Sequence, residues 1–580
     1  ELESFDYSVQ VTRDNLEEND PTFEPEKANF VELTEEELEL WYQAAQEMQE
    51  QWVEEQVAEG NSVFEEMNNI NIPLLDIKEV GTVKEVKYGI VKVDGLPNCV
   101  YGQLVQFPGG IKGMVIGFDH DEVSVILFGQ ESGISVGDTV STLADFISVP
   151  VGDGFLGRVV DSLADPVDGK GAVAAEGVVP VFRDAPGIMD RIPLSEPLET
   201  GIKIVDLVIP VGKGQRQLII GDRQTGKSTI GIDSIINQRG KNVICIYCWI
   251  GGPQTALKKQ LYALGSSGSM AHTIVVSAPA NVSAAEQYLA PYTAAAIGEY
   301  FMHNGRDVLV VFDDLTKHAW VYRQMSLLLE RSPGREAYPG DIFYLHSQLL
   351  ERAGRLDEAH GGGSMTFLPI VETLQGDIAG YIQSNLVSIT DGQLYISTPL
   401  FKEGFRPAID MGLSVSRIGS KVQSPAVREV GHGLRLEYAQ YRDMLRLTKL
   451  RTRLSPEAME RMRRGETLTR LLMQDSNKPV STDALIVLFY VYRKRVLEAV
   501  TPELLERFIT DFYAFFKDAE PDMVDALRKD REFTPLLTDS IDQNLRVFFR
   551  ALRAEEMNLR SKAHMKETRA QGIHDGMRPQ

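Results

Sequence analysis

The sequence predicts a multi-domain protein in which a β-barrel precedes an α/β domain with a mainly parallel sheet, and an α-helical bundle follows. Three observations predict this organisation: short alternating runs over 72–149, strand-like runs alternating with helix-like windows over 150–424, and amphipathic helical spacing over 425–580. A chain of 580 residues also exceeds what one hydrophobic core usually serves. We therefore expect each segment to form a domain of its own.

An acidic extension, residues 1–71, comes before the barrel. It carries 21 Asp and Glu against two basic residues, which accounts for −19 of the chain's net charge of −24. Thr34 and Glu37 form a capping box, and Trp41 and Trp52 then fall on one stripe of an amphipathic helix. Two interpretations stay open: the helix packs on its own protein, or it docks on another subunit.

Closely spaced strands predict the barrel. Runs of alternating hydrophobicity are separated by Gly, Asp and Asn, and strands at such short spacing favour a small closed β-structure. The runs that we expect to be strands are 83–87, 89–93, 103–107, 113–117 and 123–128.

A complete phosphate-loop motif lies inside the α/β domain. Residues Gly221, Asp222, Arg223, Gln224, Thr225, Gly226, Lys227 and Ser228 match the pattern G-x-x-x-x-G-K-S/T, after the apolar run 217–220. The two glycines let backbone N–H groups converge on phosphate oxygens, and the helix that follows adds its positive dipole end. Lys227 is expected to reach the β- and γ-phosphates, and the Ser228 hydroxyl to ligate Mg²⁺. The motif predicts a nucleotide site rather than a plain glycine-rich turn.

A pair of acids follows a second apolar strand in the same domain. The run 308–312 ends at Asp313 and Asp314. An acid at the tip of a buried strand beside the phosphate-loop strand is where Mg²⁺ and its waters need an anchor. We expect Asp313 to take that role, with Asp314 second.

The sequence becomes helical after Pro425. Amphipathic spacing predicts helices in five windows, followed by a polar tail. The windows are 434–450, 456–474, 483–499, 502–516 and 544–566.

Composition excludes several classes of protein. The longest apolar run, 484–492, is too short to cross a bilayer, so we expect the membrane to be reached only through partners. Cys245 and Cys248 lie in a run that reads as a buried strand, where residues three apart point to opposite faces, so a redox or metal pair is not expected. The nine His are scattered, which argues against a transition-metal site. Acidic charge and the lack of a basic stripe argue against nucleic acid as a partner.

Several longer blocks carry a resemblance to a known family. They are the approach to the loop at 196–217, the loop variant Asp222-Arg223-Gln224, and the segments 322–329, 333–347, 362–366 and 412–420. Through them the chain resembles the alpha subunit of F-type ATP synthase, a family of RecA-like phosphate-loop proteins, from about residue 80 to Gln474. Residues 1–71 depart from the family pattern.

The resemblance implies a regulatory subunit of a rotary, proton-translocating ATP synthase that binds Mg-ATP, with ATP or ADP and Mg²⁺ as its cofactors. Three such chains would alternate with three beta subunits around a central-stalk gamma subunit. A peripheral-stalk subunit of the OSCP/delta type would also bind. Because residues 1–71 depart from the family pattern and are acidic and Trp-bearing, we expect them to make an added contact with a stalk or lineage-specific subunit. A start at Glu1 and the divergent extensions favour the matrix side of the mitochondrial inner membrane over the alternatives, a bacterial plasma membrane or a plastid thylakoid.

The resemblance also assigns roles to single residues. Arg406, Pro407 and Gln474 match positions that line the adenine pocket, although Ser476 stands where a second glutamine is expected. Arg417 matches the arginine that reaches into the neighbouring beta subunit's catalytic site, where its fixed charge stabilises the transferring phosphoryl group.

One departure bears on catalysis. Catalytic beta subunits carry a glutamate that polarises the attacking water, and this chain has Gly252-Pro253 at the matching place. Neither residue can act as a base, so the chain itself is expected to be largely non-catalytic. Two other interpretations were open: a hexameric nucleic-acid translocase, and an ATPase subunit that is catalytic in its own right.

Overall fold

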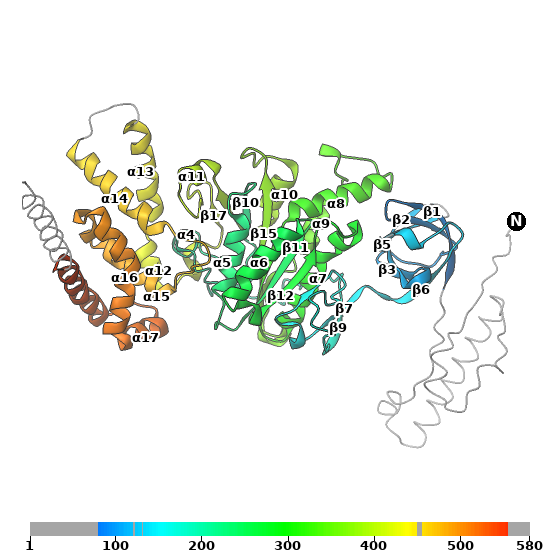
Figure 1. The fold of residues 1–580 in the computed structure, drawn as a ribbon, viewed down its shortest axis with the longest axis horizontal. Coiled ribbons are helices and arrows are strands. Elements are labelled where there is room, and N and C mark those ends of the chain that lie inside the picture. The colour runs from blue at the N-terminus through cyan, green and yellow to red at the C-terminus, as the bar shows by residue number, and fades with distance from the viewer. Residues whose placement is uncertain (1–78, 120–121, 130, 449–454, 555–580) are drawn as a thin grey trace, which may run out of the picture.

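A computed structural model describes residues 79–554, except 120–121, 130 and 449–454. Along this part of the chain a barrel, a central α/β domain and a helical domain follow one another in an elongated arrangement (Figure 1). The predicted fold class is confirmed. The helix with Trp41 and Trp52, and the polar tail, lie outside the described residues. The domain boundaries proposed from the sequence stay predictions.

Six antiparallel strands close the barrel in the order β1-β2-β5-β4-β3-β6. Alternation places Val83, Val91, Val105 and Val125 inside, where all four are almost fully buried. The strands are β1 (Val80–Lys87), β2 (Ile90–Asp94), β3 (Gln103–Gln106), β4 (Lys112–Asp119), β5 (Glu122–Phe128) and β6 (Thr139–Phe146).

The central domain is built on a sheet of order β17-β16-β10-β15-β13-β11-β12-β8, with β14 paired to β15. All neighbours pair in parallel except β16 with β17 and β14 with β15. The strands are β8 (Val159–Val160), β10 (Leu218–Asp222), β11 (Val243–Ile250), β12 (Thr273–Ala278), β13 (Asp307–Asp313), β14 (Gly354–Arg355), β15 (Ser364–Thr373), β16 (Gly392–Ile396) and β17 (Val415–Ser416). A separate antiparallel pair joins β7 (Ser148–Val151) to β9 (Gly177–Pro180).

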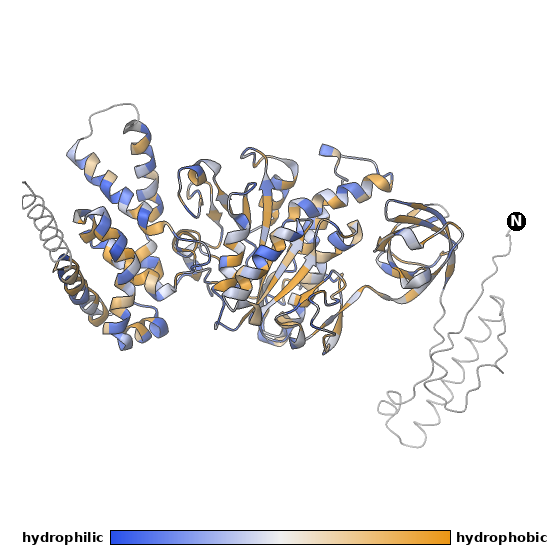
Figure 2. Ribbon diagram, viewed as in Figure 1, coloured by the Kyte–Doolittle hydropathy of each residue, from blue (hydrophilic) through white to orange (hydrophobic). Residues whose placement is uncertain are grey.

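Helices cover both faces of this sheet, so its central strands are largely apolar (Figure 2). Strand β11 is buried at every position, and Cys245 and Cys248 belong to two different core clusters, one on each face. The sequence-based placement of these two thiols on opposite faces is confirmed. The helices are α4 (Lys203–Val208), α5 (Lys227–Ile236), α6 (Gln254–Ser266), α7 (Ala284–His303), α8 (Leu315–Leu328), α9 (Ile342–Leu350), α10 (Tyr381–Ile389) and α11 (Thr398–Lys402).

The last domain is helical throughout its described part. Its helices are α12 (Pro425–Gly431), α13 (Leu434–Thr448), α14 (Pro456–Leu472), α15 (Thr482–Arg493), α16 (Pro502–Ala519) and α17 (Pro521–Asp530), and a further helix covers 535–554. The helix expected over 483–499 ends at Arg493, because Arg495 takes a left-handed conformation with φ of 60°. Helix α17 was not expected. None of the helices among the described residues is both long and apolar enough to span a membrane.

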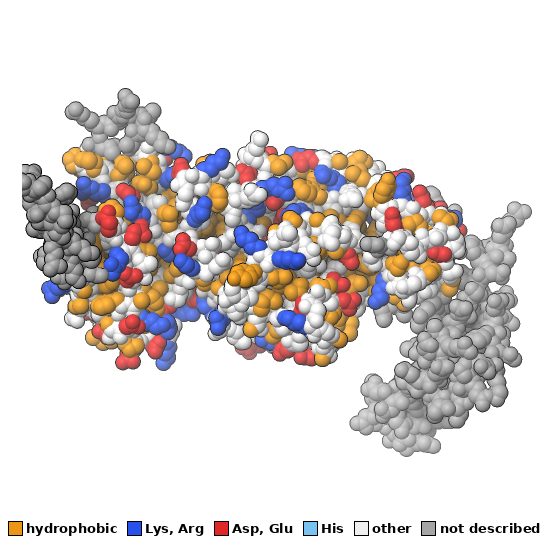
Figure 3. All heavy atoms as spheres, viewed as in Figure 1, with side chains coloured by type: hydrophobic (Ala, Val, Ile, Leu, Met, Phe, Trp, Pro, Cys, Tyr) orange, Lys and Arg blue, Asp and Glu red, His pale blue; other side chains and the backbone are white. Residues whose placement is uncertain are grey.

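Charge is mixed over the described surface. On the face drawn in Figure 3, basic and acidic side chains are interspersed, and no continuous basic stripe crosses the barrel or the central domain. A nucleic-acid channel would be expected to show such a stripe. This face therefore gives no support to the translocase interpretation.

Candidate nucleotide-binding site

The phosphate-loop motif forms a strand-loop-helix unit in the middle of the sheet. Strand β10 ends at Asp222, helix α5 begins at Lys227, and β10 pairs with β15 on one side and β16 on the other. Gly226 has φ of 99°, a conformation that only glycine adopts without strain. A Cβ on Gly221 would lie 2.7 Å from the carbonyl oxygen of Ile396, so a glycine is needed there for close packing of β10 on β16. The backbone thus has the shape of a phosphate cradle.

The Asp222 side chain holds the start of the loop in place. Its Oδ1 accepts hydrogen bonds from Thr373 Oγ1 at 2.6 Å and from the Gly376 amide at 2.7 Å, and its Oδ2 accepts one from Thr398 Oγ1 at 2.6 Å. Burial alone would raise the pKa of this carboxyl, but the three hydrogen bonds together bring it below its ordinary value. Asp222 therefore anchors the loop to β15 and α11 with a charged carboxylate.

Lys227 lies inside the loop and is almost completely buried. Its Nζ donates to the carbonyl oxygen of Asp222 at 2.5 Å, and Thr225 Oγ1 donates to the same oxygen at 2.7 Å. Burial lowers the pKa of Lys227, while Glu372, Asp314 and Asp313 act in the opposite direction. A cation held in a poorly solvated cradle has a strong preference for an anionic ligand.

The two acids predicted from the sequence lie beside the loop. Asp313, buried at the end of β13, accepts a hydrogen bond at Oδ2 from the Tyr247 hydroxyl at 2.7 Å, and the nearby Ser228 hydroxyl acts to lower the pKa of this carboxyl. Burial and the neighbouring Asp314 raise the pKa of Asp313. Asp314 caps α8 through the Lys317 amide and pairs with Lys317 Nζ at 2.5 Å. The Ser228–Asp313 pair offers the hard oxygen donors that Mg²⁺ requires, and so these residues fit the ion.

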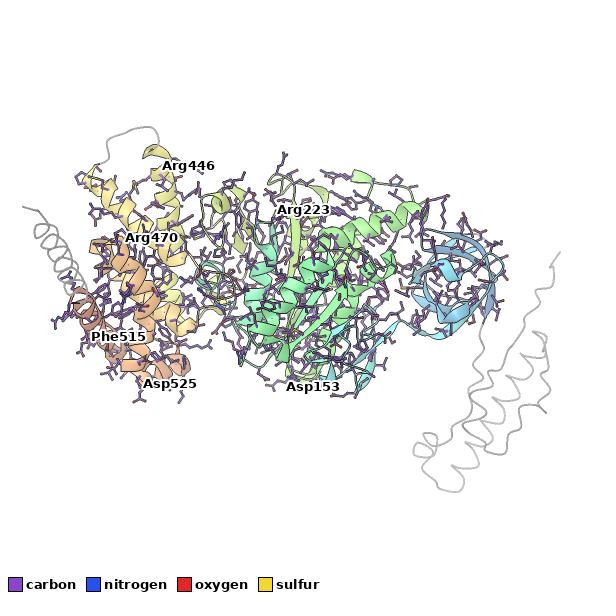
Figure 4. The ribbon with its side chains drawn as sticks, in the orientation of Figure 1. Asp153, Arg223, Arg446, Arg470, Phe515 and Asp525 are labelled. Atoms are coloured by element: carbon purple, nitrogen blue, oxygen red, sulfur yellow. The ribbon has the colours of Figure 1, made fainter. Side chains whose placement is uncertain are left out.

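Glu372 is a third acid at this edge, and the sequence reasoning did not single it out. It is the second-last residue of β15, beside the loop, and pairs with Arg223 Nε at 3.1 Å, while Arg223 itself is largely exposed. In Figure 4, Arg223 lies at the edge of the central domain opposite to Asp153. This ion pair joins the phosphate loop to β15, and the Arg223 guanidinium stays largely exposed. The only signal for it in the sequence was the acid at the end of an apolar strand.

The residues expected around adenine lie together where the central and helical domains meet. The Gln474 amide donates to the Arg406 carbonyl oxygen at 2.8 Å, next to Pro407. The Gln474 side chain accepts from the Lys203 amide at 3.1 Å and donates to the carbonyl oxygens of Gly201 and Lys478. In this arrangement the side chain of Gln474 is used to join the two domains.

Lys203 was missed from the sequence. It is buried at the start of α4, and its Nζ donates to the carbonyl oxygens of Leu471 at 2.7 Å and Met473 at 2.8 Å, at the end of α14. Burial lowers the pKa of Lys203 to about 8. These partners lie almost 270 residues away in the chain, so no local pattern could have indicated the contact.

Arg417 lies away from the acids of the loop. It follows β17, the antiparallel edge strand, and its amide donates to the Asp391 carbonyl oxygen at 2.8 Å. Its side chain is exposed. The Arg417 guanidinium is thus accessible at the edge of the sheet.

The fold and this site define a three-domain phosphate-loop protein. Three family models match the chain: the beta-barrel domain of the ATP synthase alpha/beta family over residues 76–143, the nucleotide-binding domain of that family over 201–416, and the C-terminal domain of the alpha/beta chain over 423–548. The chain is 45% identical over 480 residues to ATP synthase subunit alpha of Clostridium botulinum strain Hall, which covers 83% of this chain and 95% of the relative.

Two other relatives agree. ATP synthase subunit alpha of Clostridium acetobutylicum is 44% identical over 482 residues, with 83% of this chain and 95% of the relative covered. The subunit from Caldanaerobacter subterraneus subsp. tengcongensis is 45% identical over 460 residues, with 79% and 91% covered. The chain belongs to the alpha subunits of F-type ATP synthase.

Membership makes the chain a subunit of an ATPase complex and implies an alpha/beta hexamer with further subunits. These relatives are bacterial, so they give no support to the mitochondrial location expected from the sequence. They agree with the alternative, a peripheral sector on a bacterial membrane.

Proposed function

We propose that this chain is a regulatory, largely non-catalytic nucleotide-binding subunit of a rotary, proton-translocating ATP synthase. Mg-ATP or Mg-ADP is bound through residues 221–228, with Ser228 and Asp313 toward Mg²⁺ and with Arg406, Pro407 and Gln474 toward the base. Lys227 neutralises the phosphates, and the backbone cradle ending at Gly226 orients them. When bound, the ion would supply positive charge that stabilises the charge of the phosphates.

One observation carries the non-catalytic part of this proposal: each acid beside the loop already has a partner. Asp313 accepts a hydrogen bond from Tyr247, Asp314 pairs with Lys317, and Glu372 pairs with Arg223. A general base needs a free carboxylate within hydrogen-bond reach of the water it activates. Residue 252, where a base would be expected, is a glycine.

We propose that Arg417 is this chain's contribution to catalysis in the neighbouring beta subunit. The guanidinium would enter the catalytic site of the neighbouring beta subunit and stabilise charge on the phosphoryl group in transfer. The other partners proposed are the gamma subunit of the central stalk and a peripheral-stalk subunit. The complex is proposed to lie on the cytoplasmic face of a bacterial plasma membrane.

The nucleotide site can be tested with the full purified chain by equilibrium dialysis against radiolabelled ATP with Mg²⁺. Lys227→Gln should abolish saturable binding, because the buried cation in the cradle is lost. Lys258→Gln, on the exposed face of α6, is the matched control and should bind as the unchanged chain does. If both variants bind alike, the loop does not hold the phosphates. If the isolated chain hydrolyses ATP without a beta subunit, the non-catalytic assignment is wrong.

Residues 1–71 are proposed to contact a stalk or lineage-specific subunit, on the basis of their charge and their two Trp. The matched family models begin only at residue 76. Removing residues 1–60 should weaken assembly or lose a subunit from the purified complex. Unchanged composition and stability of that complex would contradict this assignment.

A further inference from the structure

Trp249 lies near the carboxyl end of its strand, on the side of the central sheet where the nucleotide site is built. It is the second-last residue of β11, it is 5% exposed, and it pairs in register with Asp313 on the neighbouring strand β13. Its ring shares a face of β11 with Tyr247, whose hydroxyl donates to Asp313, and the two ring centroids are 6.2 Å apart. The indole is therefore a neighbour of the proposed Mg²⁺ residues.

The indole fills the space directly over Gly252. A Cβ added to Gly252 would lie 2.2 Å from Cζ2 and 2.6 Å from Cε2 of Trp249, far inside van der Waals contact. The ring and any side chain at residue 252 consequently exclude each other. The absence of a base at 252 is thus accompanied by a large aromatic group in the volume that such a side chain would use.

A lysine lies close to the Trp249 ring. Lys317 Nζ lies 6.0 Å from the ring centroid and pairs with Asp314, and a Cβ on Gly251 would touch the aliphatic part of Lys317 at 3.0 Å. The indole Nε1 is buried, and within the described residues no acceptor lies in hydrogen-bond distance of it. A buried donor without an acceptor is costly, so the ring presents an N–H group that a ligand oxygen could satisfy.

We propose that Trp249 is a positioning residue that walls the nucleotide site at the terminal phosphate of a bound nucleoside triphosphate. By filling the volume over Gly252, the Trp249 ring excludes the side chain of a general base at residue 252. It also excludes the water molecule that hydrolysis needs. The inference rests on the proposed function, and it adds that the site is held non-hydrolytic by steric exclusion as well as by the missing base. The Trp249 ring contributes no charge, and it excludes water from the terminal phosphate of the bound nucleotide.

Fluorescence of Trp249 itself tests the placement. Phe would replace Trp41, Trp52 and Trp320 in the full chain, which leaves Trp249 as the only indole. Binding of Mg-ATP and Mg-ADP is measured by equilibrium dialysis, and emission is recorded in the same samples. The expected result is a saturable change in emission with the same half-saturation as dialysis, larger for Mg-ATP than for Mg-ADP.

The two ways of failing are distinct. No binding by dialysis would mean that the proposed function fails. Binding of both nucleotides with unchanged Trp249 emission would leave the proposed function standing and would overturn the role of Trp249.

A variant cycle tests the steric claim. Gly252→Ala forces the ring out of its place and should weaken Mg-ATP binding roughly tenfold, as expected for overpacking. Gly265→Ala in α6 is the matched control, because a Cβ there meets nothing within 4 Å. In the Trp249→Ala background, Gly252→Ala should cause no further loss. Equal affinities of the Gly252→Ala and Gly265→Ala chains, or the same loss with and without Trp249, would overturn the proposal. If Gly252→Ala does not fold, the fluorescence experiment decides.

Discussion

The Tyr247 hydroxyl donates a 2.7 Å hydrogen bond to Oδ2 of Asp313, and both residues are buried at adjoining strands of the central sheet. Burial and the nearby carboxylate raise the pKa of Tyr247 far above its ordinary range, so this hydroxyl keeps its proton and acts as a donor. The hydrogen bond from Tyr247 therefore holds the Asp313 carboxylate in a fixed orientation before any ligand arrives.

Tyr247→Phe tests this orientation. Removing the hydroxyl keeps the ring volume and deletes one hydrogen bond, which is worth about 1 kcal/mol. We expect Mg-ATP binding by the full chain to weaken roughly fivefold, with little effect on ATP binding measured in EDTA. Tyr300→Phe, which removes a hydroxyl that donates to Glu176 near the C-terminal end of α7, is the control. Equal losses with and without Mg²⁺ would mean that Tyr247 supports the fold rather than the ion site.

Arg417→Ala should leave nucleotide binding by the isolated chain unchanged and reduce steady-state turnover by the assembled complex. An arginine that stabilises the transferring phosphoryl group contributes a factor of roughly 10³ or more. Lys421→Ala removes another exposed positive charge four residues away and should retain turnover. ATP hydrolysis by complexes rebuilt with each variant, with subunit composition checked, measures the effect. Loss of binding by the isolated Arg417→Ala chain would place Arg417 in its own site instead.

The fold class could be predicted because hydrophobic periodicity changes twice along the chain. Alternating runs such as Ile90–Asp94 predict half-buried strands, continuous apolar runs such as Val243–Ile250 predict strands covered on both faces, and three- and four-residue spacing predicts the last helices. The turn at Arg495 could not be predicted, because no Gly or Pro marks its left-handed conformation.

Only the residues of the site that belong to a local sequence pattern could be predicted. Gly221–Ser228 and Asp313 follow from a fixed pattern and from a strand that ends in an acid. The contacts of Lys203 with the end of α14, and of Glu372 with Arg223, join segments that are distant in sequence. The sequence predicts Trp249 only as part of a buried strand, since nothing in the sequence shows that its ring covers Gly252.

A buried ion pair joins three segments of the central domain. Arg352 donates to both oxygens of Glu299 at 2.6 and 2.7 Å and to the Val181 carbonyl oxygen at 2.9 Å. Removing one partner leaves a buried charge unpaired, so Glu299→Gln should lower the free energy of unfolding by about 3–5 kcal/mol. Urea unfolding of the full chain measures it.

Two comparisons make that result specific. Asp475→Asn, which breaks an exposed pair with Lys478, should leave the free energy of unfolding nearly unchanged, because solvent and salt screen an exposed pair. Replacing both Glu299 and Arg352 by Met should be milder than Glu299→Gln, because no charge then stays buried. A small effect of Glu299→Gln would show that water or another group compensates Arg352.

Acid should destabilise the protein through two buried histidines. His318 and His346 are both fully buried, and their ring centroids are 6.0 Å apart. Burial lowers the pKa of His318 to about 4 and that of His346 to about 3 from an ordinary value of 6.5. Between pH 6.5 and the lowered values, the unfolded chain binds protons that the folded chain does not. Stability therefore falls as pH decreases through this window, by an amount on the order of 3 kcal/mol for His318.

His346→Leu removes one of these groups and should flatten the fall in stability between pH 6.5 and 4. Its Nδ1 and Nε2 have no hydrogen-bond partner among the described residues, so an apolar side chain leaves no partner stranded. Because carboxylates titrate in the same window, the comparison is the difference in urea midpoint between variant and unchanged chain at each pH. His432→Leu, at an exposed position, should keep the original dependence. A His346→Leu chain whose midpoint falls with pH as steeply as the unchanged chain would show that this histidine takes up its proton without unfolding.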